Sequence, residues 1–258
     1  MKFENRGQVE YVGRTNAAVE DKGEYWFSRV LGKYWVAINK DDNGLSPHIR
    51  DGFWEPWIML WVSQNVEEGF KCADLGANVG FYTYQLAASG ASVDAFEPNP
   101  AVFKLLTEAH DKNMEEHDNW SVKLINKAVS STAGEFSFIV PRNHPMNGSL
   151  HKSVYSPNGE DEITVKAVGK LGRYDFIKID IEGGEIDVFD LLDPEKHPLV
   201  LMEFRWDRYE TPIDFAEAIF EKYSNVTFVK FDGKEERLDR ASQLEAREHE
   251  DWMLVLRP

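Results

Sequence analysis

The clearest pattern in the chain is an alternation of short apolar runs with longer helical segments, which begins near residue 70. Apolar runs of the length of a strand occupy residues 70–75, 91–97, 120–130, 174–181 and 198–204. Segments of the length of a helix occupy residues 80–90, 100–113, 185–192 and 212–223. Repeated strand–helix units imply right-handed crossovers, so the alternation predicts a mainly parallel sheet covered by helices on both faces.

The alternation is interrupted once and then ends with a change of pattern. Residues 135–140 and 162–168 favour strands without an intervening helix, so we expect an antiparallel hairpin there. The connection at residues 141–161 is rich in Pro, Asn, Gly and Ser, and connections this long are usually functional or disordered. Residues 225–231 and 251–257 predict two final strands that pair antiparallel, because no clear helical segment separates them.

The first 52 residues do not follow the alternation. Residues 1–16 are polar and are expected to be mobile. Residues 33–49 predict a strand, a turn at Asp42-Asn43-Gly44 and further extended chain. We therefore predict one domain overall, with an N-terminal extension at residues 1–52 and the main α/β part at residues 53–258.

A helix is expected at residues 55–66, because proline at position 56 suits the first turn of a helix. Three tryptophans in and before it recur at helical spacing, namely Trp54, Trp57 and Trp61. That spacing is more typical of a face that packs on the core than of a binding platform.

Composition supports a folded domain and limits its partners. Of 258 residues, 42% are hydrophobic and 13% aromatic, which is enough to fill a core. The formal net charge of −16 repels phosphate backbones, so broad nucleic-acid binding is not expected. The single cysteine, Cys72, rules out an internal disulfide and a multi-cysteine zinc site.

The expected location is the cytoplasm. The first residues contain no apolar run typical of a signal peptide. The most apolar stretch, residues 53–62, is far shorter than the roughly 20 residues of a membrane helix and contains Glu and Pro. We therefore predict a soluble protein without a membrane span.

The turn after the first strand of the alternation carries the first candidate chemistry. Gly76 and Gly80 allow a tight turn and the close approach of a ligand, and the helix start favours an anionic group. Glu97 ends the next strand, where an acidic side chain often binds the two hydroxyls of a ribose; the alternative is a solvated strand end. The glycine spacing lacks the pattern that holds a pyrophosphate, which favours S-adenosylmethionine over NAD.

Asp74 is the second candidate for contact with the donor. Its carboxylate suits the ammonium group of S-adenosylmethionine, directly or through water. The alternative is a structural role, in which Asp74 caps the turn through Ala77 or Asn78.

The string "KIDIEGGE" at residues 178–185 is far more specific than a glycine turn. Together with "DLGANVGFYTYQLAASGASVDAFEPNP", "NKAVSSTAGEFSF", "NGSL" and "PLVLMEF", it resembles the FkbM family of methyltransferases over residues 52–203. One departure is Gly184, where the family usually has alanine. The residues before and after this region match only loosely.

The resemblance implies a Rossmann-like methyltransferase fold and S-adenosylmethionine as the cofactor. Its mainly parallel sheet has seven strands, with the order 3-2-1-4-5-7-6 along the sheet and an antiparallel last strand. The hairpin is an insertion into this fold. The donor site implied by the resemblance consists of Asp74, Gly76, Asn78, Gly80 and Glu97, with Ala128 and Val129 against the adenine and Asp180 beside the transferable methyl group.

Asp180 is our first choice for a base that takes the proton of an acceptor hydroxyl. It ends a central strand, at the edge where α/β sheets place their sites. We expect partial burial to raise its pKa and hence its basicity. The alternative is a structural ion pair with Lys178, two residues away on the same face of the strand.

Three further carboxylates accompany Asp180. Glu182 either takes part in binding and catalysis or caps the next helix. Glu185 belongs to the first turn of that helix, where the helix dipole favours it for structural reasons, although it is also a candidate substrate contact. Glu203 ends the following strand and either faces the acceptor as a catalytic candidate or pairs with Arg205.

The long connection and the residue after Glu203 supply the remaining candidates for acceptor binding. They are His144, Asn147, Ser149, His151 and Arg205. The carboxylates at positions 180, 182, 185 and 203 would suit a hard cation, but nothing in their spacing demands one, so no metal is predicted.

The sequence thus predicts a methyltransferase that acts on a hydroxyl of a sugar, glycan or other small molecule. Three other functions stay open, namely N-methylation, an NAD-dependent oxidoreductase, and a donor-binding protein that is catalytically inactive and serves as an interaction module. The oxidoreductase is disfavoured because the pyrophosphate glycines and an obvious hydride-relay pair are missing from the sequence.

Overall fold

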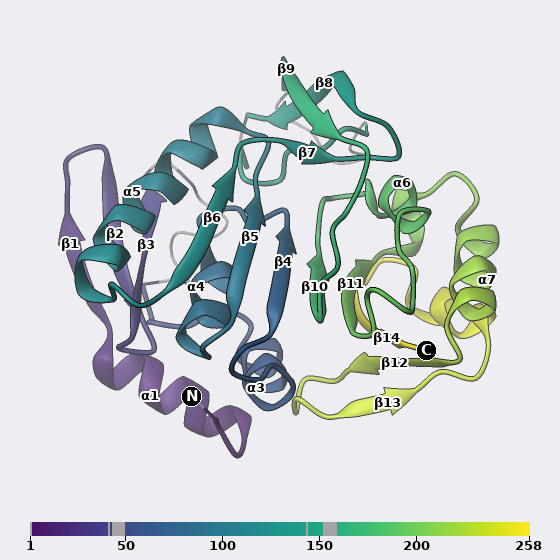
Figure 1. Cartoon of the computed structure of the whole chain (residues 1–258), viewed down its shortest axis with the longest axis horizontal. Helices are drawn as coiled ribbons and strands as arrows, with labels where there is room; N and C mark the ends of the chain where they lie inside the picture. Colours follow the sequence, from purple (N-terminus) through teal and green to yellow (C-terminus); the bar gives the residue numbers. More distant parts are fainter. Residues whose placement is uncertain (1, 41, 43–49, 143, 152–158) are drawn as a thin grey trace.

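The main sheet has eight strands, and its parallel strands end at one common edge (Figure 1). The computed structural model describes residues 2–40, 42, 50–142, 144–151 and 159–258. In spatial order the strands are β13 (Glu235–Arg237), β12 (Asn225–Val229), β14 (Trp252–Arg257), β11 (Val200–Phe204), β10 (Phe176–Ile179), β4 (Lys71–Leu75), β5 (Ser92–Phe96) and β6 (Ser121–Ile125). Neighbours from β11 to β6 pair in parallel, whereas β14 is antiparallel to both β11 and β12.

Without β13, this order is the expected 3-2-1-4-5-7-6, and the antiparallel pairing of the last strand is confirmed. The eighth strand, β13, was not expected. Glu235 attaches it to its surroundings by accepting hydrogen bonds from Trp61 Nε1 (2.8 Å), Thr227 Oγ1 (2.6 Å) and the Arg257 guanidinium (2.7 Å). One half-buried carboxylate therefore stabilises a strand that is too short to be recognised by its pattern.

Two hydrophobic cores lie on the two faces of the main sheet, because alternate strand residues point to opposite faces. Phe176 and Leu201 belong to one core, and their strand neighbours Ile177 and Val200 belong to the other. The first core is shared with α3 (Pro56–Asn65), α4 (Phe81–Ala88) and α5 (Pro100–Glu116). The second is shared with α6 (Glu185–Phe189), α7 (Pro212–Lys222) and the 3₁₀ helix η2 (Ala241–Arg247). No helix among the described residues is long and apolar enough to cross a membrane.

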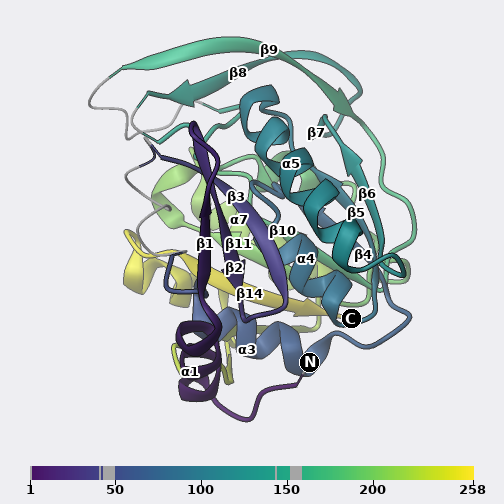
Figure 2. The same cartoon turned by 90° about the vertical axis from the view of Figure 1, so that its left-hand side faces the viewer.

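The N-terminal extension is more ordered than expected. The polar segment predicted to be mobile forms α1 (Arg6–Asn16), and Asn5 caps this helix by accepting from the Gln8 amide. A three-stranded antiparallel sheet follows, made of β1 (Ala18–Asp21), β2 (Tyr25–Val30) and β3 (Tyr34–Asn39) (Figure 2). The turn predicted at residues 42–44 falls mostly outside the described residues.

The inserted hairpin is confirmed and forms a third sheet with a short partner. Its strands are β8 (Gly134–Pro141) and β9 (Glu160–Val168), and β9 also pairs in parallel with β7 (Ala128–Val129). The single strand expected at residues 120–130 is thus split into β6 and β7. Between these two strands the chain bends from the main sheet into the small sheet. The side-chain amide of Asn126 stabilises this bend by donating to the Glu97 carbonyl (2.8 Å). The small sheet lies at the opposite end of the molecule from α1 and α3 (Figures 1 and 2).

Candidate active site

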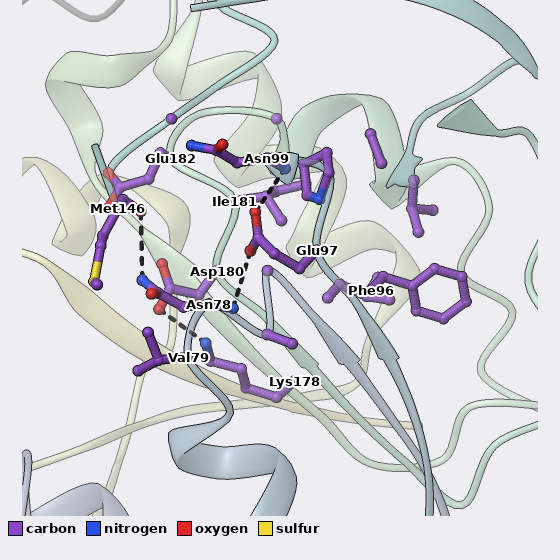
Figure 3. A pocket seen from close by; sticks show the side chains of 18 of the residues that line it. Asn78, Val79, Phe96, Glu97, Asn99, Met146, Lys178, Asp180, Ile181 and Glu182 are labelled. Atoms are coloured by element: carbon purple, nitrogen blue, oxygen red, sulfur yellow. Dashed lines mark hydrogen bonds and ion pairs between the residues drawn. The ribbon is translucent and has the colours of Figure 1, made fainter. Parts of the chain in front are cut away.

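A cavity lies at the carboxyl ends of β4, β5 and β10, the edge at which ligands bind to open α/β sheets (Figure 3). Four segments supply most of its lining: the turn after β4, the end of β5, β7, and the turn after β10. The expected donor residues that line it are Gly76, Asn78, Glu97, Ala128, Val129 and Asp180. Asp74 and Gly80 lie outside the lining. The fold therefore brings together most of the donor set, from four separate parts of the chain.

Gly76 is required by the neighbouring backbone. Its φ is +80°, and a Cβ atom built on it would lie 1.9 Å from the Asp180 carbonyl oxygen. A side chain at this position would push apart the turns after β4 and β10. The sequence suggested that a ligand approaches Gly76 closely. In the structure, the backbone of the adjacent turn at Asp180 makes this close approach to Gly76.

The amides of this turn do not form an anion site. Gly76 and Ala77 both donate to the Phe96 carbonyl (3.0 and 2.9 Å), and Asn78 donates to Glu97 Oε2 (3.0 Å). These three amides are therefore not free to bind an anionic group of a ligand, whereas the expectation for the start of α4 (Phe81–Ala88) stays a prediction. Because a pyrophosphate needs free amides at this turn, the arrangement disfavours a dinucleotide.

Glu97 is buried, with 6% of its surface exposed, so the alternative of a solvated strand end is wrong. Its Oε2 accepts from the Asn78 amide and its Oε1 from the Asn99 amide (2.9 Å). Burial raises the pKa of Glu97 to about 7, although these two amides favour the charged form. Each carboxylate oxygen keeps further acceptor capacity toward the cavity.

Asp74 is fully enclosed behind the cavity. Its Oδ2 accepts from the Thr83 hydroxyl (2.6 Å), and the Thr83 amide also donates to it. Asp74 therefore caps the start of α4 through Thr83, instead of through Ala77 or Asn78. Its Oδ1 has no hydrogen-bond partner among the described residues and lies 3.9 Å from Lys178 Nζ. Burial raises the pKa of Asp74, against the charge of Lys178.

Lys178 and Asp180 form the ion pair that the sequence suggested as an alternative, with Nζ 3.0 Å from Oδ2 (Figure 3). Partial burial raises the pKa of Asp180, but the charge and hydrogen bond of Lys178, together with the charge of Arg208, hold it below its ordinary value. The expectation of a raised pKa is therefore wrong. Asp180 is ionised at neutral pH, and its side chain lines the cavity.

Three carboxylates converge beside this ion pair. Oxygen atoms of Asp180, Glu182 and Glu203 lie within 4.8 Å of one another. Glu203 hydrogen-bonds Asp180, and its pKa is raised well above its ordinary value by burial and by the charge of Asp180. The raised pKa favours a proton on Glu203, and such a proton is donated to the ionised Asp180. Burial also raises the pKa of Glu182 to about 7.

Arg208, in the 3₁₀ helix η1 (Trp206–Arg208), compensates the charge of this cluster. Its guanidinium pairs with Glu182 (2.8 Å), with Glu203 and with Asp251 (3.3 Å). Glu203 therefore pairs with Arg208 and not with Arg205, which contacts Asp207. No motif in the sequence pointed to Arg208, because its partners lie on other elements.

Glu182 and Glu185 have different surroundings although both follow the same strand. Glu182 has a φ of +57° and does not cap α6, whose N-cap is Gly184. Glu185 is fully buried and accepts from the amides of Ile181 and Gly183 (2.9 Å each) and from the Tyr209 hydroxyl (2.9 Å). Glu185 therefore holds the turn after β10 in shape and lies outside the cavity lining.

The loop after β8 closes over the cavity. The Asn99 side chain donates to the Pro145 carbonyl (3.0 Å), and the Asn78 side chain donates to the Met146 carbonyl (3.4 Å; Figure 3). In this closed arrangement the cavity measures about 100 Å³, below the roughly 300–1,000 Å³ typical of small-molecule sites. The Asn78 Oδ1 atom is buried without a hydrogen-bond partner among the described residues.

The polar loop residues that the sequence suggested do not line the cavity. Its lining from this loop consists of Pro145, Met146, Gly148 and Leu150. His144 and Asn147 are exposed, Ser149 is buried and accepts from the His151 amide, and His151 contacts Asp187 (Nε2–Oδ2 2.9 Å). That hydrogen bond raises the pKa of His151. The loop thus presents to the cavity the residues that lie between those of the predicted set.

Comparison with known proteins identifies a methyltransferase domain that includes the segments lining the cavity after β4, β5 and β10. The family model described as the methyltransferase FkbM domain matches residues 74–229, more than half of the chain. The hexuronic acid methyltransferase AglP of Haloferax volcanii is 30% identical over 148 residues, which cover 54% of this chain and 57% of that protein. The match thus spans little more than half the length of this relative.

Two solved structures align with this chain at low identity and with TM-scores below 0.5. The methyltransferase FkbM from Methylobacillus flagellatus KT aligns with a TM-score of 0.46 and 12% identity, over 72% of this chain and 43% of that chain. The magnesium protoporphyrin IX methyltransferase from Synechocystis PCC 6803, solved with bound S-adenosylmethionine, aligns with a TM-score of 0.42 and 13% identity, over 84% of this chain and 85% of that chain. On the extent of the family match, this chain belongs to the FkbM family of methyltransferases.

Proposed function

We propose that this methyltransferase transfers a methyl group to a hydroxyl oxygen of a saccharide or another small molecule. S-adenosylmethionine is its methyl donor. The observation that carries the proposal is that Glu97 and Asp180, at the carboxyl ends of the strands on either side of β4, line one cavity. The name of the Haloferax volcanii relative, a hexuronic acid methyltransferase, supports a sugar as the acceptor.

The residues of the cavity fit the donor. Glu97 has acceptor capacity for the ribose hydroxyls, and the unpartnered Asn78 Oδ1 provides a further acceptor. Ala128 and Val129, which are buried and apolar, suit the adenine ring. The bound donor would supply a methyl group on a positively charged sulfur. Its entry requires the loop at Pro145 and Met146 to move outward, since the closed cavity is too small for a nucleoside.

The chain's contribution to the chemistry is to position the acceptor and to take its proton. A hydroxyl that gains a methyl group becomes strongly acidic, so an ionised carboxylate of low pKa is a sufficient base. Asp180 is such a carboxylate, and Lys178 holds it ionised and fixed in place. Glu203 would stabilise Asp180 by its hydrogen bond before the proton arrives. This role differs from that of a base with a raised pKa.

Binding and turnover together test the proposal. We expect calorimetry to detect binding of S-adenosylmethionine and of its demethylated product, and no binding of NAD, because the turn amides are engaged. Donor with a labelled methyl group would then be incubated with neutral and acidic saccharides, lipids and amines. Labelled methyl found as a methyl ether of a sugar supports O-methylation, whereas labelled methyl on a nitrogen would make the chain an N-methyltransferase. Binding of NAD alone would contradict the assignment, and binding without any transfer would favour an interaction module.

The pH dependence of donor binding reports on Glu97. A ribose hydroxyl donates to the ionised carboxylate, so binding should favour loss of the proton from a group whose pKa is about 7. The affinity for S-adenosylmethionine should therefore rise with pH up to about 7, by at most about tenfold per pH unit, and then level off. Calorimetry in two buffers of different ionisation enthalpy would measure the released proton. Constant affinity from about pH 5.5 to about pH 8 would argue against a ribose contact by Glu97.

A further inference from the structure

A second and larger cavity, of about 720 Å³, lies beside the carboxylate cluster. It is bordered by the start of α3, the end of β11, the turn between β12 and β13, and the segment from η2 to β14. Its volume falls within the range of sites that bind small molecules, which the closed donor cavity does not. None of the residues assigned above to the donor site belongs to its lining.

Two pairs of side chains connect the two cavities. Asp180 lines the donor cavity, and Glu203, which hydrogen-bonds Asp180, lines the second cavity. A molecule in the second cavity can therefore reach the carboxylate that we propose to accept the proton. Glu55 also borders this cavity, and its Oε2 accepts from the hydroxyl of Tyr82, which lines the donor cavity. The second cavity is thus placed where an acceptor must lie.

The wall of the second cavity includes an exposed aromatic ring. Phe231 is 61% exposed and packs edge-on against Trp57, with the ring centroids 4.9 Å apart. Trp57 packs against the first core as expected, but it is only partly buried and also borders this cavity, whereas Trp61 is fully buried. Because this ring lies at the rim of a cavity, its exposed face is available to contact a ligand there. The C–H face of a pyranose ring has the complementary shape and polarity.

The charges on the wall are mainly negative. Six carboxylates border the cavity, namely Glu55, Glu203, Asp232, Glu236, Glu250 and Asp251. The basic residues there are Lys230, Arg247 and His249, and each already pairs with a carboxylate: Lys230 with Glu236 (3.4 Å), Arg247 with Glu250 (3.3 Å) and His249 with Asp207 (3.0 Å). Such a wall accepts hydrogen bonds from hydroxyl groups and repels an anionic ligand.

We infer that the second cavity is the acceptor site of the methyltransferase, and that it takes a saccharide without an acidic group, whose ring stacks on Phe231 and whose hydroxyls donate to the carboxylates. This inference rests on the proposed function and adds the class of acceptor to it. The hydroxyl that reaches Glu203 and Asp180 is the one that is methylated.

Two monosaccharides that differ in one group test this inference without turnover. Methyl β-glucoside and methyl β-glucuronide have the same ring, and only the second carries a carboxylate. Titrations followed by nuclear magnetic resonance should show that the glucoside binds at least about threefold more tightly. Phe231→Ala should weaken its binding by about fivefold, because the stacking surface is lost, while the exposed control Tyr11→Ala should not change it.

A charge variant checks the selectivity separately. Glu236→Gln leaves Lys230 without its carboxylate partner, so the glucuronide should then bind about threefold more tightly than to the wild type, with little change for the glucoside. The inference would be overturned if the wild type bound the glucuronide more tightly than the glucoside, or if it bound neither sugar. It would also be overturned if Phe231→Ala bound the glucoside as tightly as the wild type does. Calorimetry with S-adenosylmethionine on the same samples separates the failures: retained donor binding places the error in the acceptor site, whereas its absence would overturn the proposed function itself.

Discussion

Replacing Asp180 by asparagine is expected to lower kcat by about 10²- to 10⁴-fold while S-adenosylmethionine still binds within about threefold of the wild type. Asparagine keeps the size of the side chain and its place in the cavity lining, but it cannot take the proton of an acceptor hydroxyl. The variant also leaves Lys178 with Asp74, 3.9 Å away, as its nearest remaining carboxylate partner in the described network. We therefore expect some loss of stability, of about 1–3 kcal/mol.

A matched control separates these two effects. Asp175 precedes the same strand, β10, at the opposite edge of the sheet, and its carboxylate accepts from the Lys71 amide (2.8 Å). Asp175→Asn should also weaken the fold, but it should keep the turnover of the wild type. The measurements are single-turnover transfer of labelled methyl, calorimetry with the donor, and chemical denaturation. Wild-type turnover by Asp180→Asn would remove Asp180 as the proton acceptor.

Replacing Glu97 by glutamine is expected to weaken binding of S-adenosylmethionine by about 10- to 100-fold. The carboxylate accepts from the amides of Asn78 and Asn99 through its two oxygens. A glutamine has one oxygen and one NH₂ group, so one of these amides would face a donor, and one acceptor for the ribose would be lost. The free energy of unfolding should also fall, by about 1–3 kcal/mol.

The pH profile distinguishes a ribose contact from a purely structural role of Glu97. If Glu97 binds the ribose, the dependence of donor affinity on pH near 7 should disappear in Glu97→Gln, although Glu182, whose pKa is also about 7, is unchanged. Asp94→Asn is the control on the same strand, because Asp94 accepts from the Tyr174 hydroxyl (2.8 Å) and lies outside the cavity lining. A less stable Glu97→Gln protein that binds the donor with unchanged affinity would assign Glu97 a structural role only.

The N-terminal helix shows why one part of the fold was missed. Residues 6–16 are mostly polar, and within α1 only Val9 and Gly13 are buried. Gly13 packs against the backbone at Gly52, where a Cβ atom would lie 2.7 Å from the carbonyl oxygen. A helix that docks through so small a surface gives almost no periodic signal, because hydrophobic periodicity records only the buried face.

The loop over the donor cavity was misread for a different reason. The sequence drew attention to its polar residues, since histidine and serine carry familiar chemistry. The loop instead presents its backbone carbonyls to Asn78 and Asn99 and its apolar residues, such as Met146, to the cavity. Which side of an irregular loop faces a cavity depends on contacts with distant segments, and no local pattern encodes them.

The sequence by itself determined the alternation of strands and helices and the strand ends that carry Glu97 and Asp180, because burial of apolar side chains imposes a period on the chain. Likeness to a known family supplied the order of the strands, which the structure confirms. Only the tertiary structure decided the charge state of the site. Arg208 reaches Glu182 and Glu203 from another element, and Lys178 lies 3.0 Å from Asp180, so the pKa of Asp180 falls where burial alone would raise it. Electrostatic energies depend on distances between groups far apart in the sequence, and folding alone fixes those distances.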